Sequence, residues 1–97
     1  MAISFTKYTA GDGMRSVCEV RNPQTKTLFD PDDIVMRLKD PAGTETAVTP
    51  TRLDTGIYEA SAVLDKSGVW YRQWKVSGSV EAVDEATILV EKSNFTV

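Results

Sequence analysis

LDTGIYEASAVLDKSGVWYRQW, residues 53–74, contains two runs in which apolar and polar side chains alternate, with a turn around Gly68 between them. An alternation of period two is typical of a β-strand that buries one of its faces. For the first run it predicts an inner face made of Tyr58, Ala60, Ala62 and Leu64. The stretch therefore predicts two consecutive strands of an all-β domain.

The second run is harder to orient, because Trp70 and Trp74 share one side of the strand with Arg72. The large apolar area of the two tryptophans favours the core for that side. We therefore expect Trp70 and Trp74 to pack against the core, and Arg72 to lie along an edge of the sheet with its aliphatic stem covered. Tyr71 stands alone among polar neighbours on the opposite side.

Asp54, Gly56 and Tyr58 form the motif D-x-G-x-Y at the start of the first run. The motif occurs in immunoglobulin-like sandwiches, where the chain enters a core strand through a tyrosine corner. In such a corner Gly56 supplies a turn angle that a side chain resists, while Tyr58 buries its ring and bonds the upstream backbone through its hydroxyl. The motif predicts structure and carries no chemistry.

Turn signals recur at short, even intervals along the rest of the chain, and the runs between them are too short for most helices. Further inward faces are predicted for Met14, Ser16, Cys18 and Val20, for Ile34, Met36 and Leu38, and for Ala86, Ile88 and Val90. We predict an all-β, immunoglobulin-like antiparallel β-sandwich of six or seven strands, including a first strand at residues 3–8 and a short one at 45–49. It forms one domain, residues 1–97, with short arms at residues 1–10 and 92–97.

The chain has 97 residues, a net charge of −3 at pH 7 and a single cysteine, Cys18. Polyanions repel a negative chain, so we expect neither nucleic acid nor an anionic membrane as a partner. A lone cysteine forms no intrachain disulfide, and we expect Cys18 to be a buried, inert thiol. The N-terminus has no signal-peptide pattern, which predicts a protein made in the cytoplasm.

The sequence offers no catalytic constellation. It has no histidine to act as a general base, no nucleophile elbow and no Gly-rich phosphate loop. The acidic residues Asp30, Asp32, Asp33 and Asp40 supply oxygen ligands of the kind that Ca²⁺ prefers. Their spacing matches no calcium-binding loop, and we interpret them as turn and strand-end residues. We therefore predict no enzyme activity, no metal and no cofactor.

The chain also carries an ordered series of short motifs: DPDD (30–33), DPAG (40–43), TGIYEA (55–60), LDKSGVWYRQW (64–74) and SGSVEA (77–82), followed by a closing strand that ends in EKSNF (91–95). This series resembles small virion structural proteins of tailed bacteriophages and prophages, over roughly residues 10–95. The resemblance implies a non-enzymatic component of the virion that docks on the head as a decoration protein or at the head-tail neck. It also implies many copies per particle, with capsid or connector proteins as partners.

Three residues are candidates for the docking interface, namely Tyr71, Arg72 and Phe95. Tyrosine and arginine dominate interface energetics, and ordered terminal arms are usually held against something. An alternative function uses Trp70, Tyr71 and Trp74 as an aromatic platform for carbohydrate, as in an adhesion module. The sugar-binding alternative requires exposed rings, whereas the docking function tolerates buried ones.

Overall fold

A computed structural model of the chain describes residues 6–94. Between these residues the chain forms strands and turns and contains no helix, so no helix spans a membrane there. The strands are β1 (Thr6–Thr9), β2 (Asp12–Glu19), β3 (Asp33–Lys39), β4 (Glu45–Val48), β5 (Thr51–Asp54), β6 (Ile57–Leu64), β7 (Gly68–Ser77) and β8 (Ala82–Glu91). The prediction of an all-β protein is confirmed.

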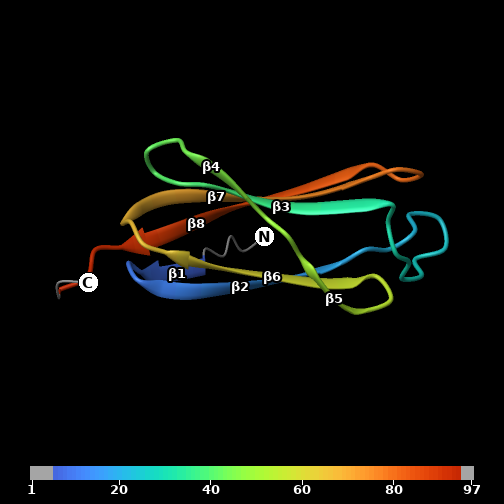
Figure 1. Cartoon of the computed structure of the whole chain (residues 1–97), viewed down its shortest axis with the longest axis horizontal. Helices are drawn as coiled ribbons and strands as arrows, with labels where there is room; N and C mark the ends of the chain where they lie inside the picture. Colours follow the sequence, from blue (N-terminus) through green and yellow to red (C-terminus); the bar gives the residue numbers. More distant parts are fainter. Residues whose placement is uncertain (1–5, 95–97) are drawn as a thin grey trace, which may run out of the picture.

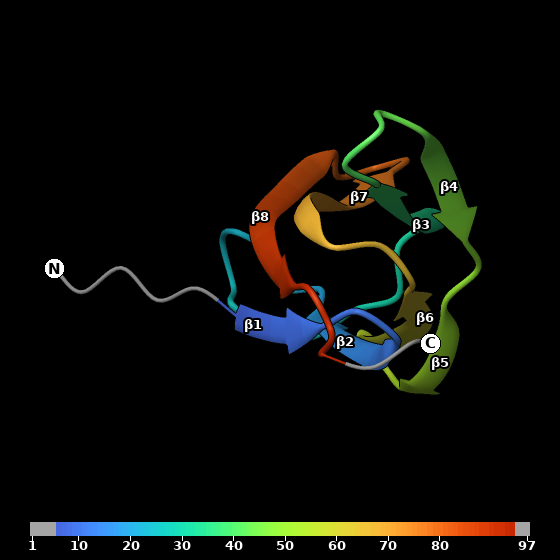
Figure 2. The same ribbon diagram turned by 90° about the vertical axis from the view of Figure 1, so that its left-hand side faces the viewer.

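The strands form two sheets that face each other as a sandwich (Figure 1). One sheet has five strands in the order β1-β8-β7-β3-β4, and the other has three in the order β2-β6-β5. The chain crosses from the first sheet to the second between β4 and β5, at Thr49 and Pro50. Viewed end-on, β1 lies between β8 and β2 and closes that side of the sandwich (Figure 2).

Two details of the strand prediction are wrong. The described residues contain eight strands, because residues 51–54 form a strand whose side chains are all exposed and which therefore shows no alternation. In addition, β1 pairs with β8 in parallel, with Thr6 opposite Ile88, whereas we predicted an antiparallel sandwich throughout. The part of the N-terminal arm that the structure describes thus belongs to a sheet, while residues 1–5 and 95–97 lie outside the described residues.

The core lies between the sheets and follows the predicted faces closely. Its buried side chains are Met14, Val20, Met36, Leu38, Tyr58, Ala60, Leu64, Trp70, Trp74, Val76, Ile88 and Val90. Cys18, Ile34 and Ala62 are partly buried and pack against this set, so Cys18 is less covered than we predicted. Met36 and Leu64 are fully buried.

Candidate functional site

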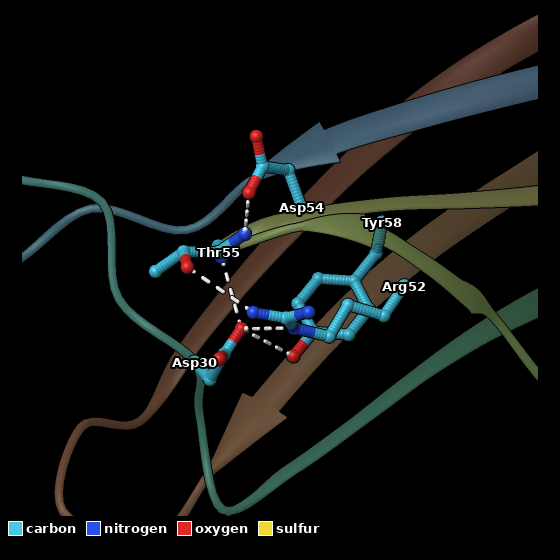
Figure 3. Close-up of polar contacts among 6 residues, drawn as sticks. Asp30, Arg52, Asp54, Thr55 and Tyr58 are labelled. Carbon is cyan, nitrogen blue, oxygen red and sulfur yellow. Dashed lines mark hydrogen bonds and ion pairs between the residues drawn. The ribbon is translucent and has the colours of Figure 1, made fainter.

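The predicted corner at Asp54, Gly56 and Tyr58 exists, but its hydrogen bonding differs from the prediction (Figure 3). The Tyr58 hydroxyl donates to Oδ1 of Asp30 at 3.0 Å rather than to upstream backbone. The same oxygen accepts the backbone N–H of Gly56 at 2.9 Å. Asp30 sits within reach because the backbone N–H of Phe29 donates to the carbonyl of Val20, which ties its loop to the end of β2. The carboxylate of Asp30 thus accepts the Tyr58 hydrogen bond that we predicted for an upstream backbone carbonyl.

A third donor completes the corner. Nε of Arg52, on β5, lies 3.1 Å from Oδ1 of Asp30, and its Nη2 donates to Oγ1 of Thr55 at 3.1 Å (Figure 3). The hydrogen bond from Arg52, followed by those from Gly56 and Tyr58, lowers the pKa of Asp30 from 3.8 to about 2. Burial and the hydrogen bond to Asp30 raise the pKa of Tyr58. Alternation did not predict Arg52 as a partner, since it lies on the strand that we did not predict.

Asp30 should contribute to stability in a pH window set by its pKa. A carboxyl whose pKa is lower in the folded state stabilises fully above its unfolded pKa, and this contribution is lost as pH falls through the folded value. We expect Asp30→Asn to be less stable than wild type, by a difference that is constant above about pH 4 and shrinks toward pH 2. Urea unfolding at several pH values measures this difference, with Asp33→Asn as an exposed control in the same region. Parallel pH profiles for wild type and Asp30→Asn would contradict the assignment.

Two of the other acidic residues that we considered as calcium ligands, Asp32 and Asp40, have protein partners, while Asp33 is exposed. Oδ2 of Asp32 accepts the backbone N–H of Ser79 at 3.0 Å. Asp40 accepts Nζ of Lys66 at 2.8 Å and the backbone N–H groups of Ala42 and Thr44, which lowers its pKa. Within residues 6–94, no group of three or more acidic, cysteine or histidine side chains is arranged to hold a metal ion.

Both tryptophans lie in the core, as predicted. Trp70 is 6% and Trp74 2% exposed, and their indole N–H groups donate to the carbonyl of Lys66 and to Oγ of Ser16, each at 2.9 Å. Gly68, which precedes Trp70, has a φ of 127° and its missing side chain leaves room for Pro41. The aromatic platform proposed for carbohydrate therefore has only one exposed ring, that of Tyr71.

Tyr71 and Arg72 point to opposite faces of the five-stranded sheet, so the structure does not bring these two interface candidates together. Arg72 lies on the inner face with its side chain 15% exposed, which confirms that its stem is covered. Its strand is not at a sheet edge, because β7 pairs with both β3 and β8. Nη2 of Arg72 instead reaches Oδ2 of Asp84, on β8, at 3.2 Å. Phe95 lies outside the described residues.

Tyr71 projects from the outer face with 52% of its surface exposed. In the sheet register it stands opposite Lys39 on β3 and Thr87 on β8. These residues, together with Arg37, line a shallow depression of about 590 Å³. The side chains of Arg37 and Lys39 are exposed and make no hydrogen bond or ion pair with any described residue. We call Arg37, Lys39, Val69, Tyr71 and Thr87 the outer face.

Comparison with protein-family models and with curated proteins gives no match. Several solved structures are similar to this chain, including the following two. The first is a DUF4785 family protein from Legionella pneumophila, with a TM-score of 0.71 and 22% identity over 88% of this chain, which spans only 26% of that protein. The second is the Lin-41 filamin domain, with a TM-score of 0.70 and 19% identity over 93% of this chain and 87% of that domain. At such identities the likeness concerns the fold alone, and the chain has an immunoglobulin-like β-sandwich fold.

Proposed function

We propose that the protein is a non-enzymatic structural component of a tailed-phage virion. In this function it docks on the head as a decoration protein or at the head-tail neck, with capsid or connector proteins as partners. The assignment to a phage rests on the motif series in residues 30–82 and the EKSNF ending. The proposal of a docking protein rests on the outer face.

The observation that carries the docking proposal is the exposure of Tyr71 at the centre of a sheet. An aromatic ring that is 52% exposed on an interior strand, beside two cationic side chains that have no partner within residues 6–94, is available to anchor a partner protein. Val69, two residues before Tyr71 on the same face, is 40% exposed and extends the apolar surface. Tyrosine and arginine are, with tryptophan, the residues that most often anchor protein interfaces.

Binding in many copies would compensate for the small size of the outer face. Each copy would contribute a modest contact, and many copies on a symmetric particle bind with a combined strength that no single contact provides. A domain that contacts two neighbouring subunits binds only the assembled shell, so it shifts the equilibrium toward assembly. The expected effect is a particle that resists heating better with the protein than without it.

Co-sedimentation with phage heads that lack the protein tests this function. We expect saturable binding and a raised melting temperature of the heads, and Tyr71→Ala should weaken binding by about 30-fold, the effect of losing roughly 2 kcal/mol at an interface anchor. Val63→Ala is the matched control, because Val63 is 63% exposed on the other sheet. Unchanged binding by Tyr71→Ala would remove the outer face from the proposal, and no binding by wild type would contradict docking on the head.

A further inference from the structure

The two sheets leave a seam open along one side of the sandwich. There β2 pairs only with β6, so its other edge is unpaired within residues 6–94. On the opposite sheet, β1 pairs with β8 opposite Ile88 to Glu91, and among the described residues 6–94 only β7 pairs with residues 82–87 of β8. Figure 2 shows β1 between β8 and β2, and in Figure 1 β1 lies at only one end of these strands. Within the described part of the chain, the remaining length has an unpaired strand edge on each side.

Along the open part of the seam, the two sheets are separated by a groove. One depression of about 380 Å³ is lined by residues 18–21 on the β2 side and by residues 80 and 82–84 on the β8 side. A second, of about 280 Å³, is lined by residues 14–17 and by residues 84 and 86–88, together with Tyr8 of β1. Both include Asp84, so they lie end to end along the seam. Six residues of β8 extend over about 20 Å, the length of an average strand. We call this the seam groove.

The floor of the seam groove is mostly apolar at the end nearest the β7–β8 turn. Val20, Trp74, Val76, Val80 and Ala82 contribute to its lining. Val20, Trp74 and Val76 are already buried in the core, whereas Val80 is half-buried and Ala82 is exposed. Apolar side chains of an inserted segment would cover Val80 and Ala82.

Arg72 adds a charge at the centre of the seam groove. Its side chain is 15% exposed, and its one partner among the described residues is Asp84, whose side chain is 75% exposed. A guanidinium has five N–H donors, so several remain for another acceptor. The second depression includes both Arg72 and Asp84, which places these donors at the groove. A carboxylate is the acceptor that fits a guanidinium best.

We propose that the seam groove binds an extended strand of a neighbouring protein subunit, with apolar side chains facing the floor and a carboxylate facing Arg72. The unpaired edges of β2 and β8 would supply backbone hydrogen bonds, as in other cases of strand addition. A strand is the fitting occupant because β1 already fills the adjoining part of the same seam in this way. The proposal goes beyond docking through the outer face and takes from the proposed function only the source of the strand.

Cys18 lines the seam groove and is the only cysteine, so its alkylation reports on occupancy. The probe is a synthetic nine-residue peptide of alternating valine and threonine with glutamate in place of the central valine. We expect saturating peptide to slow alkylation of Cys18 by iodoacetamide about tenfold, since a peptide at ten times its Kd leaves about a tenth of the sites open. A peptide with lysine at the centre should give no protection. Equal protection by both peptides, or protection by neither, would overturn the proposal.

Two variants and one control make the result specific. Ala82→Arg fills the groove from an exposed position and should abolish protection, while Val63→Arg on the outer side of the other sheet should leave it unchanged. Arg72→Met should remove the preference for glutamate over lysine. Protection that develops without peptide as the protein concentration rises would assign the groove to a second copy of this chain and overturn the proposal as stated. None of these readouts depends on binding to heads, so docking and strand capture can fail separately.

Discussion

Replacing Gly56 with alanine is expected to destabilise the domain by at least about 3 kcal/mol, a large share of the 5–15 kcal/mol that a folded domain has. Gly56 has a φ of 70°, a conformation in which a side chain costs roughly 1–2 kcal/mol. An added Cβ would also lie 2.8 Å from the backbone nitrogen of Phe29 and 2.9 Å from the carbonyl oxygen of Val20. Both atoms are backbone, so neither can swing away as a side chain would.

The steric conflict extends beyond one contact. The N–H of Phe29 donates to the carbonyl of Val20 at 3.0 Å, and the N–H of Val20 donates to the carbonyl of Gly56 at 2.7 Å. A Cβ placed between them forces apart the hydrogen bonds that hold the loop carrying Asp30. The Asp30 corner would then lose its geometry together with the turn.

Gly43→Ala is the matched control for this substitution. Gly43 also has a positive φ, 90°, but an added Cβ there meets nothing within 4 Å. The free energy of unfolding of Gly43→Ala should therefore fall only by the conformational cost of the positive φ, about 1–2 kcal/mol. Urea unfolding of both variants separates backbone strain from collision, and equal losses would show that the contacts around Gly56 do not matter.

Much of the sandwich could be predicted because side-chain alternation reports burial directly. Tyr58, Leu64, Trp70 and Trp74 all lie in the core as their positions in the strands indicated. Apolar area also predicted correctly that the side of β7 that carries Trp70, Arg72 and Trp74 faces the core. Alternation is reliable here because each of these strands has one covered and one solvated face.

Features that depend on partners distant in the sequence could not be predicted. The exposed strand β5 has no buried face to produce alternation, and the parallel pairing of β1 leaves no local signal. Asp30 lies 28 residues from Tyr58, and nothing in a D-P turn indicates that its carboxylate will receive a tyrosine hydroxyl. The outer face and the seam groove are likewise known only once strand order is known, because they combine side chains from β2, β3, β7 and β8.

Trp74→Ala is expected to cost about 3–5 kcal/mol, the usual penalty for removing a buried large aromatic side chain. Trp74 is 2% exposed and stands opposite the fully buried Met36 in the sheet register. Its indole N–H donates to Oγ of Ser16 on β2 at 2.9 Å, so the same side chain both fills the core and links the two sheets. The alanine variant would lose packing and leave the hydroxyl of Ser16 without this donor.

Trp74→Phe separates these two contributions, because it keeps most of the ring and removes the N–H. We expect it to cost less than alanine but more than Ser16→Ala, which keeps the ring and removes only the acceptor. Tyr71→Ala, on the outer face of the same strand, should change the free energy of unfolding by less than about 1 kcal/mol while weakening docking. Such a contrast would assign the two aromatics separate tasks, with stability depending on Trp74 and the proposed binding on Tyr71. A Tyr71→Ala variant as unstable as Trp74→Ala would mean that the outer face is structural, and docking through it would have to be abandoned.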